Sequence, residues 1–484
     1  MNIVFVSNRL PIVIEPSKSG STVHRGSGGL VTALDSLLRR SGGTWLGWPG
    51  TSDLKTEEIE KLLADFSRSQ GYQIAPVPLA EKEYIQFYEG FCNQIIWPLF
   101  HDLQSLCNFE PEFWHYAQQV EQKFAMAVES HAQPDDLIWV HDYQLMGLGK
   151  VLADRGLGNK LAFFLHIPFP PPDIFCKLPW RRQVLEALLR YDVVGLQTTR
   201  DLDNFLQCGQ RLLPDVQQQR TPRQATLEMK GRNALAGVFP IGIDFDEFAD
   251  GAAKPEVARK AEELRQNCAD RQIILSVDRL DYTKGVLYRL RALERALERY
   301  PDLHQHVTFF QVVVPSRENV PQYHTLKTDI EQSVGQINGR FTAPGWIPIH
   351  HVFRHVERNE LLAWYRAADV AIVTSLKDGM NLVAKEYCAC QLDGNGVLVL
   401  SEFAGAAEQL GRWAVMINPY DTDGVAEAIK LAVSMTPAQR HPAMEKLRSN
   451  IRTQNVYWWV SEFLRACGRG YDQADVSLAA AGVN

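Results

Sequence analysis

Residues 273–285 read IILSVDRLDYTKG, and this stretch decides the fold class of the chain. It opens with a nearly uninterrupted apolar run, Ile273–Val277, and continues into charged residues and a glycine. A short run rich in Ile and Val is typical of a strand buried on both faces of a parallel sheet. The next segment, 287–300, has Leu and Tyr at three- to four-residue spacing and predicts an amphipathic helix. A strand followed by a helix indicates an α/β fold built from crossover units.

The same pattern recurs along the chain. Eight further short apolar runs have this composition and flanking residues: Ile3–Val6, Leu137–Val140, Leu161–Leu165, Val193–Leu196, Val307–Val314, Val370–Val373, Val397–Leu400 and Val415–Ile417. Nine strands in two groups predict two doubly wound sheets, with a boundary near Pro240–Phe248. The Gln/Arg-rich stretch Gln217–Arg223 predicts a surface excursion just before that boundary.

Composition narrows the class of protein. A length of 484 residues predicts two or three domains, and 45% apolar with 22% charged residues excludes a disordered or fibrous chain. The balance of 50 basic against 57 acidic residues, a net charge of −7, disfavours nucleic acid as a partner. Membrane insertion is not expected either, because the chain has no apolar run near the length of a membrane span.

Location is predicted from the N-terminus and the cysteines. The opening residues MNIVFVSNRLP have the pattern of a first strand rather than of a secretory signal. The eight cysteines are scattered without a CxxC pair, which favours reduced, mostly buried thiols in a cytoplasmic protein.

Polar residues follow the apolar runs, where open α/β sheets bind ligands. His141 and Asp142 follow one run, and His166 follows the next, ahead of a rigid proline loop. A lone histidine is more often structural, but two polar groups at the ends of neighbouring strands favour a site.

Two cations follow the run 273–277. Arg279 and Lys284 lie five residues apart beside Gly285, an arrangement that suits a diphosphate, although charges at a helix start are often only solvated. Arg317 follows the run 307–314 through Pro315 and Ser316 and would face the same edge of the sheet.

Two glycine-containing turns precede helices. Gly26-Ser27-Gly28-Gly29 opens the helix expected at Leu30–Leu38; such a turn suits phosphate, but it lacks the dinucleotide and P-loop patterns and also reads as a plain turn. In the second turn Asp378 leads through Gly379–Leu382 into a helix that carries Glu386. Its amides suit phosphate or sugar hydroxyls, and a carboxylate at Glu386 suits the hydroxyls of a ribose.

Other patterns indicate structure rather than chemistry. His350, His351 and His355 are expected in a loop as structural or surface histidines, because the neighbouring Pro and Gly argue against a helix and no Cys or carboxylate completes a metal site. The Arg/Glu positions of 289–299 are expected to form a solvated helix face. A serine hydrolase or zinc protease is disfavoured, because G-x-S-x-G and HExxH are absent from the sequence.

Taken in order, these segments resemble the retaining glycosyltransferases that make trehalose 6-phosphate. The matching motifs are VSNRLP (6–11), GGTWLGWPG (42–50), IWVHDYQL (138–145), FFLHIPFP (163–170), SVDRLDYTKG (276–285), KDGMNLVAKEY (377–387), VLVLSEFAGAA (397–407) and NPYD (418–421). The resemblance implies a GT-B fold, two Rossmann-like domains facing across a deep cleft. Domains 1–240 (acceptor) and 241–454 (donor) are implied, with a C-terminal helix, 455–475, packing back on the first.

The resemblance also implies roles for single residues, with no metal or cofactor. Those assigned to UDP-glucose, the donor, are Gly28, Arg279, Lys284, Asp378, Gly379, Met380, Asn381, Leu382 and Glu386. Those assigned to glucose 6-phosphate, the acceptor, are Arg9, Trp45, Tyr88, Trp97, Asp142 and Arg317. Catalysis is assigned to Arg279, Lys284, Asp142 and His166, the last beside the transferring glucose. Arginines suit a phosphate dianion, and Tyr and Trp add hydrogen-bond donors without adding charge.

Departures from the family pattern leave alternatives open. The loop SKSGSTVHRG, the stretch PPPDIF and the region 214–236 leave room for glycerol 3-phosphate as acceptor, as in a relative that makes glucosylglycerol phosphate. A silent sugar-phosphate sensor is a further alternative, disfavoured because every expected polar position is filled. The donor base stays open, and relatives form dimers or tetramers.

Overall fold

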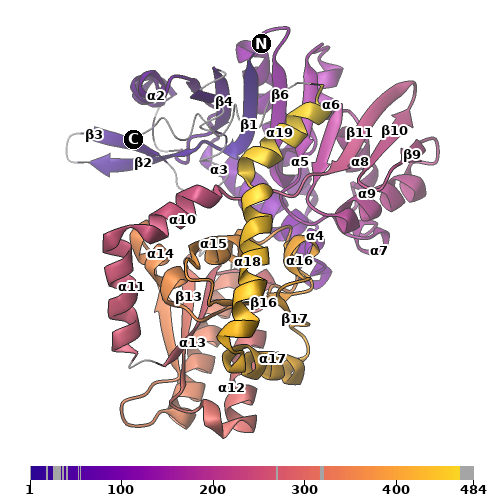
Figure 1. Ribbon diagram of the computed structural model, residues 1–484. Helices are drawn as coiled ribbons and strands as arrows, with labels where there is room; N and C mark the ends of the chain where they lie inside the picture. The colour runs from indigo at the N-terminus through magenta and orange to yellow at the C-terminus, as the bar shows by residue number, and fades with distance from the viewer. Residues whose placement is uncertain are drawn as a thin grey trace. The chain divides into compact units, whose positions relative to one another are not determined.

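A computed structural model describes residues 2–17, 20–25, 34, 38–39, 42–52, 54, 56–268, 271–316 and 321–468. The chain divides into two compact units (Figure 1). The N-terminal unit comprises Met1–Ile241 and Val456–Asn484, and the C-terminal unit comprises Gly242–Asn455.

The N-terminal unit is built on a sheet in the order β5-β4-β1-β6-β7-β8-β11-β10-β9. From β5 to β11 neighbouring strands are parallel, and β9, β10 and β11 form an antiparallel meander at the edge. The strands are β1 (Ile3–Arg9), β4 (Gly43–Trp48), β5 (Gln73–Pro76), β6 (Leu137–His141), β7 (Lys160–Phe164), β8 (Val193–Leu196), β9 (Gln217–Arg220), β10 (Gln224–Met229) and β11 (Arg232–Val238). A separate hairpin joins β2 (Ile12–Ser17) to β3 (Gly20–Arg25).

Helices connect these strands. They are α2 (Thr56–Gln70), α3 (Glu81–Tyr84), the π-helix η1 (Ile85–Ile96), α4 (Trp97–Phe100), η2 (Gln104–Leu106), α5 (Pro111–His131), η3 (Tyr143–Leu145), α6 (Leu148–Asp154), α7 (Pro172–Phe175), α8 (Arg181–Leu188) and α9 (Thr199–Leu212). Thr198 caps α9 with a reciprocal bond to Asp201, whose carboxylate also accepts the Phe169 N–H at 2.8 Å and anchors the proline loop.

The C-terminal helix α19 (Val456–Ala466) belongs to this unit (Figure 1). Its aromatic face packs on the sheet: Phe463 stacks on Trp139 of β6 at 4.5 Å between ring centroids, and Trp459 lies edge-on to Phe164 of β7 at 4.9 Å. Trp459 and Phe463 are fully buried, so this contact adds several kcal/mol of apolar burial, at about 2–3 kcal/mol for each ring.

The C-terminal unit contains a six-stranded, all-parallel sheet in the order β14-β13-β12-β15-β16-β17. The strands are β12 (Gln272–Arg279), β13 (Val307–Val314), β14 (Ile349–Phe353), β15 (Val370–Val373), β16 (Val397–Ser401) and β17 (Val415–Ile417). The helices are α10 (Phe245–Ala253), α11 (Pro255–Asn267), η4 (Tyr282–Lys284), α12 (Val286–Arg299), η5 (Pro301–Leu303), α13 (Pro321–Phe341), α14 (Arg358–Ala367), α15 (Leu382–Cys390), α16 (Ala407–Leu410), α17 (Thr422–Ser434) and α18 (Pro437–Thr453).

The apolar runs become strands as predicted. All nine are confirmed within three residues at their ends, and 287–300 lies in α12 and its C-cap. Apolar continuity did not reveal β4 (GTWLGW) or β5 (QIAP), because glycine, threonine and proline interrupt their runs. The excursion predicted at 217–223 is exposed, but 217–220 forms the edge strand β9.

The loop prediction is wrong for His350 and His351 and holds for His355, which is exposed in the loop that follows the strand. Ile349–Phe353 forms the edge strand β14, paired in parallel with β13. Pro344, Gly345 and Pro348 form the turn that precedes this strand rather than extending through it. His350 stacks on Phe310 of β13 at 4.9 Å, so this histidine is part of the packing of the sheet.

Candidate functional site

In the C-terminal unit, the carboxyl end of β12 carries the two predicted cations. β12 ends at Arg279, whose side chain is exposed, and the single turn η4 follows and ends at Lys284. Asp281 fixes this turn, since its carboxylate accepts the Thr283 N–H at 2.9 Å and the Thr283 hydroxyl at 2.8 Å. Both cations therefore lie on one rigid turn at the ligand-binding edge of the sheet.

A buried arginine locks that turn to its neighbours. Arg289, 1% exposed, donates to Asp278 at 2.6 Å, to Gln311 at 3.1 Å and to Thr374 at 2.8 Å, and so joins α12 to the ends of β12 and β15 and to the middle of β13. Gly285 lies against Thr374, where a Cβ would come 2.2 Å from the Thr374 carbonyl oxygen. The prediction of a solvated face for 289–299 is therefore wrong at Arg289, which a buried carboxylate draws into the unit.

Lys284 already has a counter-charge. Its Nζ lies 2.6 Å from Asp378 Oδ2, and both side chains are 14% exposed. The same carboxylate oxygen accepts the Ser375 hydroxyl at 3.1 Å and Asn381 Nδ2 at 3.2 Å. In this arrangement Asp378 holds Lys284 in place, a contact that the sequence pattern did not predict.

The turn after Asp378 has the backbone that a ligand loop needs. Asn381 adopts φ 83° and caps α15, its side chain accepting the Ala384 N–H at 3.0 Å, so the helix begins at Leu382. The segment after β16 packs closely against this turn. Gly405 lies so near Gly379 that a Cβ on Gly405 would come within 1.9 Å of the Gly379 carbonyl oxygen. Met380 is 3% exposed. The predicted turn feeding a helix at 379–382 is confirmed.

Glu386 lies one turn into α15. Its carboxylate accepts the Tyr365 hydroxyl at 2.9 Å, and burial raises its pKa above the ordinary value. The hydrogen bond from Tyr365 acts in the opposite direction and stabilises the carboxylate. Glu386 is thus a partly buried, oriented acceptor, which suits recognition of hydroxyl groups.

In the N-terminal unit, the ends of β6 and β7 meet at three polar residues. Asp142 follows β6 at φ 73°, a conformation that non-glycine residues rarely adopt. Its carboxylate accepts the His166 backbone N–H at 3.1 Å, and its own N–H donates to the Phe164 carbonyl at 2.8 Å. Asp142 and His166 are therefore brought together by backbone bonds, with the strain located where function is expected.

His141, which the sequence placed at the strand end without a role of its own, is a partner of His166. Its Nδ1 lies 3.2 Å from His166 Nε2, and the two rings stack at 5.5 Å. Burial lowers the pKa of His166 to about 3 and lowers that of His141 well below the ordinary value. Both imidazoles are therefore neutral near pH 7, so His166 acts by hydrogen bonding rather than as a cationic acid.

Arg9 begins a continuous stack of aromatic rings. Its guanidinium lies 5.8 Å from the ring centroid of Trp48, Trp48 stacks on Tyr84 at 4.4 Å, and Tyr84 stacks on Tyr88 at 5.2 Å. The structure thus brings Arg9 and Tyr88, 79 positions apart, to the two ends of one stack. No role was predicted from the sequence for Trp48 or Tyr84. The signal that could have identified them is that both are aromatic residues close to residues assigned to the site.

Tyr88 and Trp97 are aligned by an unusual helix. Residues Ile85–Ile96 form a π-helix of 12 residues, a rare conformation that is frequent at functional sites. In an α-helix, nine residues make two and a half turns and would point the two rings to opposite sides. The wider π-helix has a little over four residues per turn, so nine residues make about two turns and place both rings on one side.

Asn93 ties this helix to the Asp142 loop. Its side chain, 3% exposed, donates to the Tyr88 carbonyl at 2.7 Å and accepts the Tyr143 hydroxyl at 3.0 Å. Tyr143 follows Asp142 and packs against Trp97 at 5.6 Å between ring centroids. One buried amide therefore couples three of the predicted acceptor residues.

The remaining predicted residues are not brought to this surface. Trp45 is 2% exposed and lies in the core of the sheet, where its indole N–H donates to the Ser7 hydroxyl at 2.8 Å; its place near the acceptor stays a prediction. Gly28 and Arg317 lie outside the described residues, as does most of the helix expected at Leu30–Leu38.

Comparison with known proteins identifies the family. Residues 1–469 match the model of glycosyltransferase family 20. This chain belongs to glycosyltransferase family 20. A trehalose-6-phosphate synthase of Mycobacterium sp. (strain KMS) is 41% identical to this family 20 chain over 470 residues, which cover 96% of this chain and 94% of the relative.

Two further relatives extend the comparison. A bifunctional trehalose-6-phosphate synthase/phosphatase of Thermoproteus tenax is 39% identical over 476 residues, and the match spans 96% of this chain but 63% of that protein. A crystal structure of an α,α-trehalose-phosphate synthase (UDP-forming) from Burkholderia xenovorans, in complex with glucose 6-phosphate, is 33% identical with a TM-score of 0.86; the match covers 97% of this chain and 100% of the other. These findings confirm the predicted GT-B fold and a glycosyltransferase.

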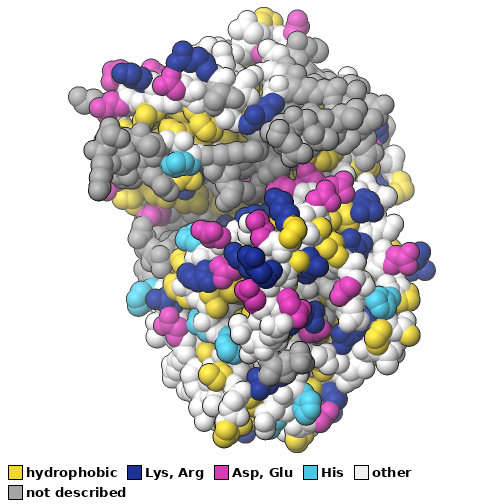
Figure 2. All heavy atoms as spheres, turned by 60° about the vertical axis from the view of Figure 1, so that its left-hand side comes forward, with side chains coloured by type: hydrophobic (Ala, Val, Ile, Leu, Met, Phe, Trp, Pro, Cys, Tyr) yellow, Lys and Arg dark blue, Asp and Glu magenta, His cyan; other side chains and the backbone are white. Residues whose placement is uncertain are grey.

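The described part of this family 20 chain has neither a cluster of metal-ligating side chains nor a helix suited to a membrane. In the described ranges, no three His, Cys, Asp or Glu side chains come together as a metal site. None of the helices that the structure describes is both long and apolar enough to span a bilayer. On the face in Figure 2, acidic and basic side chains are interspersed over the described part of the C-terminal unit.

Proposed function

We propose that this chain transfers glucose from UDP-glucose to glucose 6-phosphate, giving trehalose 6-phosphate and UDP with retention of configuration. The observation that carries the proposal is the match, over nearly the whole of both chains, to a UDP-forming trehalose-phosphate synthase that binds glucose 6-phosphate. Mass balance supplies the rest. A trehalose phosphate made from glucose 6-phosphate with release of UDP requires UDP-glucose as donor. The α-linked donor and the α,α-linked product require retention.

The donor half of the proposal rests on Arg279 and Lys284. Negative charge grows on the departing diphosphate as the glycosidic bond breaks, and preorganised cations stabilise that charge. Lys284 is held by Asp378 at 2.6 Å, while Arg279 is exposed on the same turn. The oriented carboxylate of Glu386 supports its assignment to the ribose hydroxyls, and the backbone of 379–382 supports assignment to the glucose and phosphate.

The acceptor half rests on the N-terminal unit. Arg9, at the end of the aromatic stack, is the described cation offered to the phosphate of glucose 6-phosphate, and Tyr88 and Trp97 present rings on one side of the π-helix. Asp142 is assigned to the acceptor sugar, and the neutral His166 to the transferring glucose. Because burial lowers the pKa of His166 to about 3, its imidazole is a weak base, and the proton of the attacking hydroxyl is assigned to the leaving phosphate oxygen on the same face of the sugar.

The proposal also covers the cellular location and the oligomeric state of the chain. The eight cysteines are free thiols, and burial raises the pKa of Cys388 to about 12, which keeps that thiol unreactive and suits the reducing cytoplasm. Association into dimers or tetramers is expected from the family, and light scattering of the purified chain measures it directly.

A donor-by-acceptor matrix tests the proposed reaction. UDP-, ADP- and GDP-glucose are each combined with glucose 6-phosphate, glycerol 3-phosphate or no acceptor, and nucleotide release and product mass are measured. We expect release of UDP and a hexose disaccharide phosphate only when UDP-glucose and glucose 6-phosphate are both present. A larger rate with glycerol 3-phosphate would replace the proposed acceptor, and no transfer in any combination would favour a silent sensor.

A further inference from the structure

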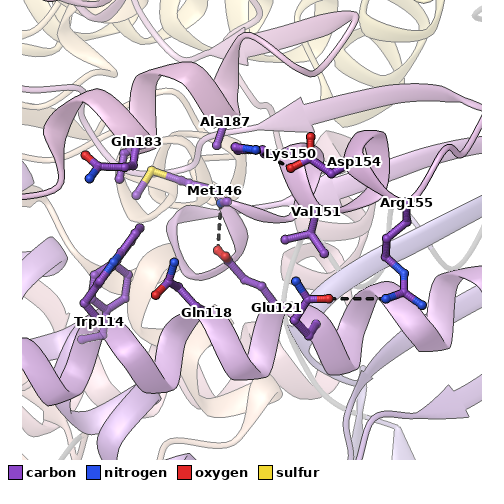
Figure 3. Close-up of a pocket in the computed structure, with 14 residues that line it drawn as sticks. Trp114, Gln118, Glu121, Met146, Lys150, Val151, Asp154, Arg155, Gln183 and Ala187 are labelled. Atoms are coloured by element: carbon purple, nitrogen blue, oxygen red, sulfur yellow. Dashed lines mark hydrogen bonds and ion pairs between the residues drawn. The ribbon is translucent and has the colours of Figure 1, made fainter.

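The N-terminal unit contains a cavity away from Asp142 and His166. It lies between α5, α6 and α8, with a volume of about 270 Å³ (Figure 3). At about 30 Å³ per water molecule, this volume corresponds to roughly nine waters and admits a small organic molecule. None of the side chains that line it has a role in the proposed reaction.

One wall of the cavity is aromatic. Trp114 of α5 lines it together with Phe91 of the π-helix, their ring centroids 5.5 Å apart. Trp180 stacks on Trp114 at 5.1 Å with planes 10° apart, which fixes the indole. An immobilised indole offers a large, rigid apolar surface to the hydrocarbon part of a ligand.

The same cavity is lined by a buried carboxyl group, that of Glu121. Glu121 of α5 lines the cavity, is 6% exposed, and accepts the Gly147 N–H at 2.9 Å (Figure 3). Gly147 approaches so closely that a Cβ there would lie 2.3 Å from both carboxyl oxygens. That single backbone hydrogen bond is the contact that the structure gives this carboxyl group among the described residues.

The charges around Glu121 are paired with other groups. On α6, Lys150 pairs with Asp154, and just beyond it Arg155 pairs with Glu129 at 2.6 Å. Two cations are thus paired with two of the three carboxyl groups in this region. The third carboxyl group, that of Glu121, has no cationic partner among the described residues.

The neighbouring elements contribute no cation to Glu121. Tyr191 is the other titratable group beside it, with its hydroxyl held by the Gly149 N–H and the Leu145 carbonyl. From α8 the cavity receives residues without charge, namely Gln183, Val184 and Ala187.

Burial without a cation raises the pKa of Glu121 to about 8, against which the Gly147 N–H acts only partly. When no cation is bound to it, the carboxyl group of Glu121 therefore carries a proton near pH 7. A ligand that brings a positive charge takes the place of that proton and restores the carboxylate.

We propose that this cavity is a binding site for a small organic ammonium ion, with the ammonium group on Glu121 and the apolar part against Trp114. The geometry of a buried carboxyl group without a cation, two turns along α5 from a fixed indole that lines the same cavity, carries the assignment. A neutral ligand of the same size would gain the aromatic wall but would leave the carboxyl group protonated. The site is independent of the proposed sugar transfer.

The test uses the full-length chain and two probes of equal size, n-butylammonium and n-butanol. Binding is measured by calorimetry or saturation-transfer NMR at several pH values. We expect n-butylammonium to bind at millimolar concentrations and its affinity to rise roughly 25-fold from about pH 6.5 to about pH 8.5, as the carboxyl group loses its proton. The affinity for n-butanol should be weaker and insensitive to pH.

Two variants complete the test. Glu121→Gln keeps an oxygen for the Gly147 N–H but removes the charge, and we expect at least a tenfold loss of n-butylammonium binding. Glu112→Gln, at an exposed carboxylate in the first turn of the same helix, is the matched control and should bind as the wild type does. The proposal is overturned by equal binding of the two probes, by unchanged binding in Glu121→Gln, by a flat pH profile, or by no binding of n-butylammonium. If Glu121→Gln does not fold, the wild-type pH series decides alone.

Discussion

Lys284 lies 2.6 Å from Asp378, so its ammonium has a counter-charge before any substrate binds. A diphosphate arriving at this turn competes with a carboxylate that Ser375 and Asn381 also hold. Arg279, exposed at the end of β12, has no such anchor in the described part of the chain and is available to the ligand from the start. The two cations therefore differ in how they are presented, a difference that sequence spacing alone did not indicate.

Removing either cation should slow the transfer step. We expect Arg279→Ala and Lys284→Ala each to lower kcat at least roughly a hundredfold, because losing one preorganised donor to a developing charge has that effect in other enzymes. Turnover is followed by UDP release from UDP-glucose and glucose 6-phosphate. Lys260→Ala, at an exposed lysine of α11 in the same unit, is the control. Near-normal turnover in both variants would remove these residues from the mechanism.

The depressed pKa of His166 gives a second prediction. Below about pH 6.5 the unfolded chain protonates this histidine, whereas the folded chain does not until about pH 3. The pKa is lower in the folded state, so its contribution to stability is complete above about pH 6.5 and is lost as the pH falls. His166→Asn should therefore reduce the slope of unfolding free energy against pH, between about pH 6 and 4, by about 1.4 kcal/mol per pH unit.

Urea unfolding at several pH values measures that slope. His306→Asn, which removes an exposed imidazole, is the control and should leave the slope as in the wild type. If His166→Asn and the wild type lose stability in parallel, the histidine is solvated and its assigned hydrogen-bonding role is in doubt.

At the scale of elements, each half of the site is held in place by buried contacts between secondary-structure elements. In the C-terminal unit Arg289 joins three strands to α12. In the N-terminal unit the π-helix and Asn93 join Tyr88 and Trp97 to the Asp142 loop. Neither set of contacts has a clear sequence pattern. An arginine among helix-surface charges reads as solvated, and a π-helix has no periodicity distinct from that of an α-helix over so short a stretch.

Arg289 should matter to stability more than its neighbours do. Arg289→Met leaves Asp278 buried without a partner, which is expected to cost about 3–5 kcal/mol of unfolding free energy. Arg291→Met, two positions along the same helix at an exposed arginine, should change it by less than about 0.5 kcal/mol. Chemical denaturation of both variants measures this, and equal losses would show that the buried ion pair contributes nothing special.

Asn93 should affect the acceptor and not the donor. Asn93→Leu keeps the volume but removes the bonds to Tyr88 and Tyr143, and we expect KM for glucose 6-phosphate to rise about tenfold, equivalent to about 1.4 kcal/mol. KM for UDP-glucose should stay within twofold, roughly the error of such comparisons.

Asn108→Leu, at a less buried asparagine that bonds Gln94, is the matched control for Asn93→Leu. Equal rises in both KM values, or none in Asn93→Leu, would show that the amide only supports folding.

At the scale of the whole molecule, apolar continuity predicted both sheets and all nine strands on which the two-unit interpretation was based. It failed where side-chain pattern does not carry the information. Gly43–Trp48 and Gln73–Pro76 are strands because they pair with β1 and with each other, not because their residues favour strands. Likewise β14 is a strand because β13 offers it an edge.

The candidate site was predicted from the sequence to a similar extent. Residues that follow strand ends, such as Arg279, Asp378 and Asp142, were found because parallel sheets gather strand ends at one edge. Their partners Trp48, Tyr84 and Asn93 were not, and His141 was noted at a strand end but given no role, because contacts between distant segments depend on packing. Trp45, an aromatic residue of a matching motif, is buried by the sheet, and its place near the acceptor stays a prediction.

The configuration of the product tests the central claim most directly. The chain is incubated with UDP-glucose and glucose 6-phosphate, and the purified disaccharide phosphate is examined by proton NMR. The account predicts two anomeric doublets, both with the small coupling of an α linkage, in a 1,1-linked product. A β-linked product, glucose released by hydrolysis, or transfer to glycerol 3-phosphate in preference to glucose 6-phosphate would contradict it.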